Sequence, residues 1–108
     1  MGTHTYQYQY VFQTYTLTCT LSLPPGVSTS SSTACTAKKS GAADVTITIA
    51  AGATSGTASV TNGAYTLSAP DITHGGKTYA PSGTASVTIN NADNSGTLTY
   101  ALKVSLSL

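Results

Sequence analysis

DVTITIAAGATSGTASV, the stretch Asp44–Val60, decides the fold class. Val45, Ile47 and Ile49 alternate with threonine, and such alternation of apolar and polar side chains indicates a strand with one buried face. Gly52–Ser55 consists of small residues that favour a turn, and a second strand-like run follows it. The stretch therefore predicts two strands joined by a short turn.

The same alternation returns along most of the chain. It is clearest between Leu98 and Leu108, where every second residue is apolar. No segment keeps the 3.6-residue period of an amphipathic helix for long. About seven short strands are typical of an immunoglobulin-like sandwich, although the Cys-Trp-Cys pattern of antibody domains is missing. We therefore expect residues 1–108 to form one all-β domain, a single immunoglobulin-like antiparallel β-sandwich.

Three turns connect strands whose apolar faces match in register. Asn62-Gly63 is a favoured two-residue hairpin turn, because both residues tolerate positive φ. Gly52–Ser55 and Ala92–Ser95 have the composition of four-residue loops. All three turns are expected to close antiparallel hairpins. The expected apolar pairs are Ile47 with Val60, Ile49 with Ala58, Val60 with Tyr65, Ala58 with Leu67, Ile89 with Leu98, and Val87 with Tyr100.

Two stretches interrupt the strand pattern. From Pro24 to Ala43 the chain is rich in Ser, Thr, Ala and Gly, so we expect a long surface loop. Residues 70–82 are expected to form a second long connection, with a short strand at Lys77–Ala80. The apolar phase also shifts by one residue at Gln13-Thr14, which predicts a bulge or a strand that changes sheets.

SGTASVT occurs twice, at Ser55–Thr61 and at Ser82–Thr88, and Ser95-Gly96-Thr97 is a shortened third version. In both full copies Ser-Gly ends a predicted loop and the following residues begin a predicted strand. We therefore interpret the repeated sequence as the end of a turn followed by the start of a strand, at equivalent places in the fold. The unequal spacing of the three versions argues against a solenoid.

Asp44–Val60 also resembles the strand, small-residue loop and strand of bacterial immunoglobulin-like and Calx-beta-like repeats, found in bacterial surface proteins and phage virion proteins. The resemblance covers the middle of the chain, from Asp44 to about Asn91, and it implies a structural or adhesive module. Calx-beta-like domains bind calcium through several acidic residues. Calcium binding is not carried over, because the acidic residues of this chain are only Asp44, Asp71 and Asp93.

Charge is scarce, and this excludes several classes of partner. The chain has four Lys and three Asp, a formal net charge of +1, and neither Arg nor Glu. Binding to nucleic acid needs clustered basic residues, and Lys38-Lys39 is the only basic pair. The sequence contains no run of about 18 apolar residues, the length that a membrane-spanning helix needs. We expect neither nucleic acid nor a membrane as partner.

Residues 1–13, the N-terminal arm, are the candidate assembly element. Glutamines occupy one face of the predicted strand Thr5–Tyr15, and the segment has no charge, Pro or Gly. Its backbone edge therefore invites pairing unless it is covered. Either the arm adds to the sheet of a neighbouring copy, or it is a first strand whose aromatic residues fill its own core. The candidate interface residues on the other face are Tyr6, Tyr8, Tyr10 and Phe12.

Cys19 and Cys35 are the two cysteines. In an oxidising compartment, a disulfide between them would join the predicted surface loop to the second strand. The alternative is that Cys19 is a buried thiol between Leu17 and Leu21, and that Cys35 is an unpaired loop residue. The sequence leaves both interpretations open.

Motifs for catalysis and metal binding are weak. Asp71 and His74 lie three residues apart, but no Gly-x-Ser-x-Gly motif accompanies them. Asn91–Gly96 imitates the start of a calcium loop, with Leu102 where the twelfth-position Glu belongs. His4 and His74 lack further ligands at metal-binding spacing. We expect no catalytic residue, no metal site and no cofactor.

The function expected from these features is structural. We expect a non-enzymatic subunit of a large assembly, with a bacteriophage virion component (head decoration, fibre or tail) ranked first. A bacterial extracellular filament or adhesin subunit that assembles by strand addition ranks second, and a carbohydrate-binding module third. The start of the chain lacks a secretory leader, which favours the virion over the cell surface. The expected partners are copies of the chain itself, in a homo-oligomer, and other virion or surface-assembly proteins.

Overall fold

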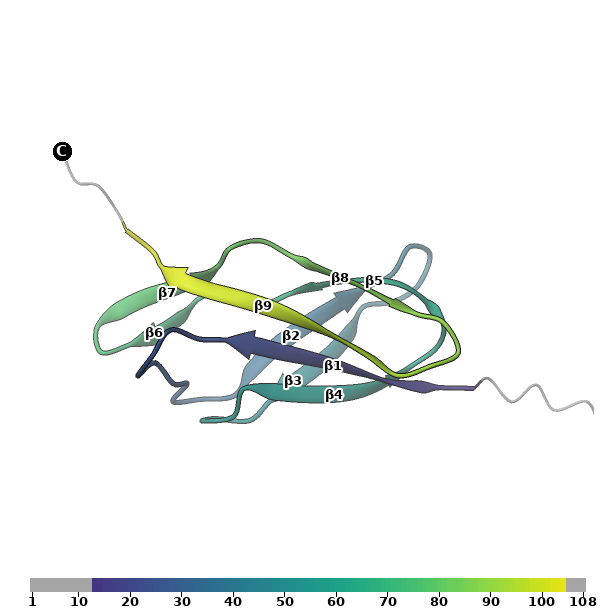
Figure 1. Ribbon diagram of the computed structural model, residues 1–108, viewed down its shortest axis with the longest axis horizontal. Coiled ribbons are helices and arrows are strands. Elements are labelled where there is room, and N and C mark those ends of the chain that lie inside the picture. The colour runs from purple at the N-terminus through teal and green to yellow at the C-terminus, as the bar shows by residue number, and fades with distance from the viewer. Residues whose placement is uncertain (1–12, 105–108) are drawn as a thin grey trace, which may run out of the picture.

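Alternating segments become strands throughout residues 13–104, the part of the chain that the computed structural model describes (Figure 1). They form two sheets that pack as an all-β sandwich, as expected, with nine strands in place of about seven. The strands are β1 (Tyr15–Ser22), β2 (Thr33–Lys38), β3 (Val45–Ile49), β4 (Ser55–Val60), β5 (Gly63–Ser68), β6 (Ile72–His74), β7 (Lys77–Pro81), β8 (Ala85–Ile89) and β9 (Asn94–Leu102).

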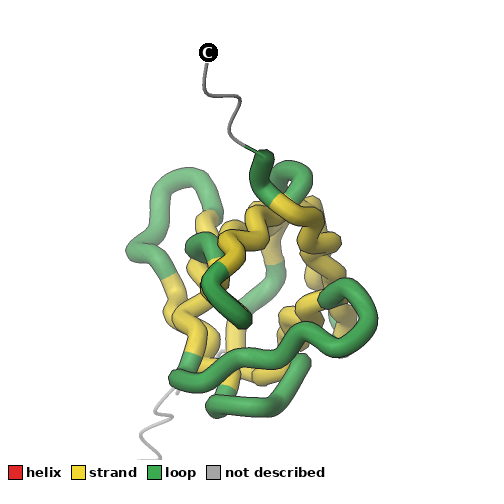
Figure 2. Tube along the Cα trace, turned by 90° about the vertical axis from the view of Figure 1, so that its left-hand side faces the viewer, coloured by secondary structure: helices red, strands yellow, loops and turns green. Residues whose placement is uncertain are grey.

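The five-stranded sheet has the order β4-β1-β9-β7-β6, and the four-stranded sheet has the order β3-β2-β5-β8. Viewed from the end where β9 finishes, strands lie in two layers and loops pass between them (Figure 2). Within the five-stranded sheet, β1 is antiparallel to β4 and parallel to β9. Because the first and last strands run side by side in one direction, β1 begins at one end of the sandwich and β9 finishes at the other (Figure 1).

The core is made of the apolar faces that alternation predicts. On β3, Ile47 and Ile49 are fully buried, and on β9, Leu98 and Tyr100 are 2% and 3% exposed. Threonines between them point outward, where they keep strand propensity without adding charge. The remaining buried apolar residues are Leu17, Cys19, Leu21, Cys35, Ala37, Val60, Tyr65, Leu67, Ile72, Val87 and Ile89.

The three predicted hairpins are wrong. Each turn carries the chain from one sheet to the other: β3 and β4, β4 and β5, and β8 and β9 lie in different sheets. Val60 therefore pairs with Tyr15, and Tyr65 pairs with Val87. Two strands that face one core from opposite sheets must also match their apolar faces, so matching faces could not reveal which strands are hydrogen-bonded.

The predicted surface loop from Pro24 to Ala43 is also wrong, because it contains β2, an inner strand of the four-stranded sheet. The inward residues Thr33, Cys35 and Ala37 are all buried. Their small side chains gave the segment a loop-like composition. In the second long connection, the predicted short strand is present as β7, and it pairs with the unpredicted strand β6.

The glycines of the two full SGTASVT copies, Gly56 and Gly83, have different roles, so the expectation of equivalent places is wrong. Gly56 and Gly96 lie on either side of Cys19 in one row of the five-stranded sheet. A Cβ at Gly56 would lie 2.5 Å from the Thr48 carbonyl oxygen. Gly83, in the second full copy, lies in the loop before β8 with φ of 149° and has nothing within 4 Å of an added Cβ.

The space at Gly96 is equally tight. A Cβ there would overlap the side chain of Val87 and lie 2.8 Å from Leu67 Cδ1, both on the four-stranded sheet. The two sheets therefore approach closely along the row that contains Gly56, Cys19 and Gly96, and side chains larger than hydrogen on either side of Cys19 would force them apart.

Candidate functional site

The arm joins the sandwich at Tyr15, the first residue of β1. The Tyr15 hydroxyl donates to Gln13 Oε1 at 2.8 Å and also lies 3.3 Å from Asn91 Oδ1, in the loop before β9. The point from which the arm leaves is thus fixed to the body of the domain. The predicted interface residues of the arm lie outside the described residues: Tyr6, Tyr8, Tyr10 and Phe12.

The loops around this point are tied together by side-chain hydrogen bonds. Asn62 Nδ2 donates to Asn91 Oδ1 at 3.0 Å, and the Asn91 backbone N–H donates to Asn62 Oδ1 at 2.8 Å. Asp93 Oδ1 accepts a hydrogen bond from the Thr16 N–H at 2.8 Å. Asn91 has φ of 57°, a left-handed conformation that asparagine tolerates better than most residues. We call this region, with its hydrogen-bonded loops, the closed end.

Lys39 completes the closed end. Its ammonium donates to Thr61 Oγ1 at 2.9 Å and to the Asn62 carbonyl oxygen at 3.1 Å. It also lies 5.2 Å from the centre of the Tyr65 ring, within the range of a cation–π interaction. The buried Tyr65 donates its hydroxyl to the Thr61 carbonyl oxygen at 2.8 Å. The polar groups at this end therefore satisfy one another.

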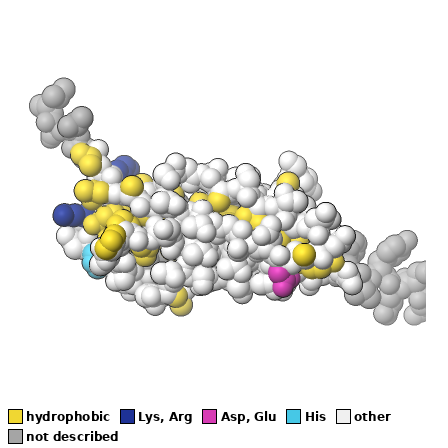
Figure 3. All heavy atoms as spheres, in the orientation of Figure 1, with side chains coloured by type: hydrophobic (Ala, Val, Ile, Leu, Met, Phe, Trp, Pro, Cys, Tyr) yellow, Lys and Arg dark blue, Asp and Glu magenta, His cyan; other side chains and the backbone are white. Residues whose placement is uncertain are grey.

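The other end of the five-stranded sheet leaves apolar side chains uncovered. Ile72, Tyr79 and Leu102 form one row across β6, β7 and β9. Exposure increases along the row, from 6% at Ile72 through the half-buried Tyr79 to 47% at Leu102. Val104, at the next position of the β9 alternation, is 71% exposed. We call Tyr79, Leu102 and Val104 the C-terminal patch, and Figure 3 shows hydrophobic side chains gathered at this end.

A groove of about 460 Å³ runs beside the C-terminal patch. Lys103 at its edge forms an ion pair with Asp71 at 3.2 Å. Lys77 makes no ion pair with any of residues 13–104. The surface thus combines apolar side chains with cations. The residues lining the groove are Gly76, Lys77, Thr78, Leu102 and Lys103.

Both cysteines are fully buried and free, and they face each other from different sheets, Cys19 on β1 and Cys35 on β2. Cys35 is therefore not a loop residue, and an oxidised bridge between the two sulfurs would join the two sheets. A hydrogen bond between the two thiols, together with burial, raises the pKa of Cys19 far above its ordinary value. The structure brings together the two residues of the predicted disulfide, which stays a prediction.

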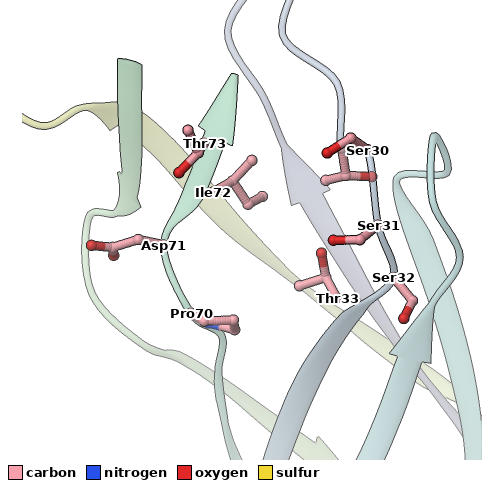
Figure 4. Close-up of a pocket in the computed structure, with 9 residues that line it drawn as sticks. Ser30, Ser31, Ser32, Thr33, Pro70, Asp71, Ile72 and Thr73 are labelled. Carbon is pink, nitrogen blue, oxygen red and sulfur yellow. The ribbon is translucent and has the colours of Figure 1, made fainter. Parts of the chain in front are cut away.

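A second groove, of about 290 Å³, is rich in hydroxyl groups (Figure 4). Ser30–Thr33, before and at the start of β2, face Pro70–Thr73, which lead into β6. The Asp71 carboxylate points away from the serine side, toward its partner Lys103. The lining offers no aromatic ring on which a sugar could stack, so the groove gives a carbohydrate-binding module no specific support.

The residues of the weak catalytic and calcium-like motifs make ordinary structural contacts. His74 Nδ1 lies 3.1 Å from the Ser28 carbonyl oxygen and 3.4 Å from the Ser28 nitrogen. In the calcium-like loop, Asn94 Nδ2 donates to the Thr88 carbonyl oxygen at 2.9 Å, and Asp93 accepts the Thr16 N–H. Within residues 13–104 no group of three or more His, Cys, Asp or Glu is placed to hold a metal ion.

A scan against protein-family models, a search of curated proteins and a search of solved structures each found no match to this chain. In the described part of the chain, no helix is long and apolar enough to cross a membrane.

Sequence analysis missed the C-terminal patch. The alternation from Leu98 onward predicted a covered strand, whereas β9 ends at Leu102 and its apolar face is exposed there. Alternation shows which side of a strand is apolar, but only the length of the facing sheet decides whether that side is covered. The one available signal was that the apolar pattern continues to the last residue, Leu108.

Proposed function

We propose that the protein is a non-enzymatic structural subunit of a large assembly, and that this assembly is a bacteriophage virion. In the virion it would serve as a head decoration, fibre or tail component. Its partners are copies of itself and other virion proteins, and it needs no cofactor, nucleic acid or membrane. The setting rests on the resemblance of Asp44–Val60 to repeats of phage virion and bacterial surface proteins.

The observation that carries the proposal is the attachment of the arm to the sandwich. An uncharged, strand-forming segment with four aromatic residues on one face precedes Tyr15. Gln13 and Thr14 are exposed and precede β1, which begins at Tyr15. A strand of this composition lowers its free energy by pairing with another sheet, and copies of the chain supply one.

The surface is suited to close packing among neighbours. Charged residues make up only 6% of the chain. Strong net charge keeps subunits apart in solution, and a net charge of +1 opposes self-association little. The outward strand residues are mostly Ser and Thr, which can hydrogen-bond to a neighbour without the desolvation cost of a charge.

We also propose that the sandwich is immunoglobulin-like in the broad sense of two packed sheets joined by crossing connections. Its strand order differs from that of antibody constant domains, in which the first two strands share a sheet. Here β1 and β2 lie in different sheets. The likeness therefore supports a structural module without supporting any specific ligand.

The test is the molar mass in solution, measured by light scattering after size exclusion, of the full chain and of a chain that starts at Gln13. The proposal predicts an oligomer or polymer for the full chain and a folded monomer for the truncated one, which retains every described core residue. A monomeric full chain whose truncation unfolds would show that the arm is a core strand and would overturn the proposal.

Genomic context separates the virion from the second candidate, a bacterial filament or adhesin subunit at the cell surface. Portal or capsid genes beside the gene support the virion. A leader sequence encoded upstream of Met1 supports the surface filament, which would assemble by the same strand addition.

A further inference from the structure

We propose that the arm of one copy docks on the C-terminal patch of a second copy, so that subunits join head to tail. The inference rests on the proposed function, in which the arm is an assembly element, and it adds the surface that receives the arm. Three observations carry it: the distance between the two sites on one subunit, the exposed side chains of the patch, and the cations beside it.

The geometry prevents the arm from covering the patch of its own subunit. β1 and β9 are parallel with Leu17 beside Asn94, so Leu102 lies ten residues farther along the sandwich than Tyr15. At about 3.3 Å per residue, this is a path of about 33 Å. From Tyr15, a fully extended chain carries Tyr6 at most about 32 Å, and the aromatic residues that follow it reach less far. The aromatic face as a whole can therefore meet only the patch of another copy.

The patch has the features of an interrupted core. Leu102 and Tyr79 lie opposite each other on β9 and β7, with their side chains on the same side of the sheet as the buried Tyr100 and Ile72. Leu102 is nevertheless 47% exposed. The core-facing side of the five-stranded sheet thus extends past the part that the four-stranded sheet covers. An apolar segment bound there would continue the hydrophobic core.

The arm matches this surface in charge as well as in polarity. Residues 5–12 carry no ionisable acid or base except tyrosine, so they bring no carboxylate to pair with the lysines. Tyrosine rings instead attract ammonium groups through their π faces. The same contact is present within the subunit, where Lys39 lies over Tyr65 at 5.2 Å. Lys77, which lines the adjoining groove and makes no ion pair with any of residues 13–104, is placed to repeat it with a tyrosine of the arm.

The area available is sufficient for association. Four aromatic side chains that each bury about 150–250 Å² supply roughly 600–1,000 Å², close to the 800 Å² or so that each partner of a stable complex contributes. Because the donor and receiver surfaces differ, the contact is heterologous. Heterologous contacts produce closed rings or open filaments according to the rotation between neighbouring subunits.

The experiment mixes two full-length variants. The arm variant carries Tyr6→Ser, Tyr8→Ser, Tyr10→Ser and Phe12→Ser, and keeps the patch. The patch variant carries Leu102→Asp and Val104→Asp, and keeps the arm. The matched control carries Thr97→Asp and Thr99→Asp, which place the same two charges on the exposed, outward face of β9. Light scattering gives the mass of each sample, and thermal melts show whether each variant is folded.

Head-to-tail docking predicts that the full chain and the control with Thr97→Asp and Thr99→Asp assemble alike. Each of the other variants alone is a monomer, with at least a tenfold weaker association constant. An equimolar mixture of the two forms a dimer and nothing larger, because it contains one functional arm and one functional patch per pair.

Different failures have different meanings. If the patch variant assembles like the full chain while the arm variant does not, the arm docks elsewhere, which overturns this inference and leaves the proposed function standing. A mixture that stays monomeric also overturns the head-to-tail pairing. A full chain that is monomeric at every concentration overturns the proposed function itself. If the patch variant melts early, Leu102→Ser with Val104→Ser replaces it in the same mixture.

Discussion

The closed end and the C-terminal patch lie at opposite ends of the sandwich, and they differ in how their apolar side chains are covered. At the closed end, Asn62, Asn91 and Lys39 join the loops through hydrogen bonds, and Tyr65 is buried beneath them. At the patch, Leu102 and Val104 have no such cover. An end whose polar groups are hydrogen-bonded to one another therefore needs no binding partner, whereas a row of exposed apolar side chains is stabilised by a partner that covers it.

The largest expected difference comes from removing one large apolar side chain at each end. Tyr65→Ala should lower the free energy of unfolding by about 3–4 kcal/mol, because it leaves a cavity in the core. Leu102→Ala should cost less than about 1 kcal/mol, since half of that side chain is already in water. Urea denaturation at low protein concentration measures both. Equal losses would show that the two ends do not differ.

Gly96→Ala tests the close approach of the sheets between the two ends. The added methyl group overlaps Val87 and presses on Leu67, so we expect a loss of about 2 kcal/mol from overpacking. Val87→Ala makes room for it. The double variant should therefore be less destabilised than the sum of the two single variants, and strict additivity in urea denaturation would contradict the steric explanation.

Tyr100 marks the border between the sealed core and the patch. Burial, with smaller effects from Cys19, Cys35 and Asp71, raises its pKa to about 12, and its hydroxyl donates to the Pro70 carbonyl oxygen. The unfolded chain releases this proton near pH 10 and the folded chain near pH 12, so stability present below pH 10 falls as pH rises through this window.

The expected loss at Tyr100 is on the order of 2 kcal/mol, from a shift of about two pKa units. Urea midpoints between pH 8 and pH 12 should fall less steeply for Tyr100→Phe than for the unchanged chain. Identical slopes in the two proteins would mean that Tyr100 is not protected from water in the way the structure indicates.

A smaller effect than those in the core is expected at the amide pair of the closed end. Asn91→Ala removes the Oδ1 that accepts from Asn62 Nδ2, while the backbone N–H of residue 91 can still donate to Asn62 Oδ1. It also places a side chain less suited to positive φ there, for a total cost of about 1–2 kcal/mol. Asn91→Gly, which loses the same oxygen but accepts the backbone conformation, should cost less. The order of the two thermal midpoints checks this, and a reversed order would speak against backbone strain at residue 91.

Strand positions and inward faces could largely be predicted from the sequence, because alternation follows directly from burial on one side. Ile47, Ile49, Leu98 and Tyr100 are buried as expected. Hydrogen-bonded partners could not be predicted at the turns, since Asn62-Gly63 can link two sheets as well as two strands of one sheet. Only the competition among all strands for neighbours decides between these outcomes.

Residue identity misled the sequence analysis where packing depends on small side chains. Cys35 and Ala37 are as buried as any leucine, yet their segment had a loop-like composition. The seven-residue repeat suggested that Gly56 and Gly83 are equivalent. Gly56 instead shares its tightly packed environment with Gly96 of the shortened copy, whereas Gly83 lies in an open loop. The close contact between the two sheets requires glycine at residues 56 and 96, and no local sequence pattern indicates where the sheets come close.

The candidate site was also only partly predictable from the sequence. The aromatic face of the arm is visible in the sequence as Tyr6, Tyr8, Tyr10 and Phe12. Its proposed receiver was not visible, because the patch depends on where the four-stranded sheet stops covering Leu102. The pairing of Cys19 with Cys35 was one of two open interpretations, and the structure places both thiols in the core without forming the bond.

The most direct test of the account is a crosslinking measurement between copies. A photoreactive benzoylphenylalanine replaces Tyr8 in full-length chain, which is mixed with unmodified ¹⁵N-labelled chain before illumination and mass spectrometry. Head-to-tail docking predicts crosslinks from the benzoylphenylalanine copy to the ¹⁵N-labelled copy that map to residues 76–79 or 102–104. Crosslinks confined to single chains, or crosslinks between copies that map to the closed end, would contradict it.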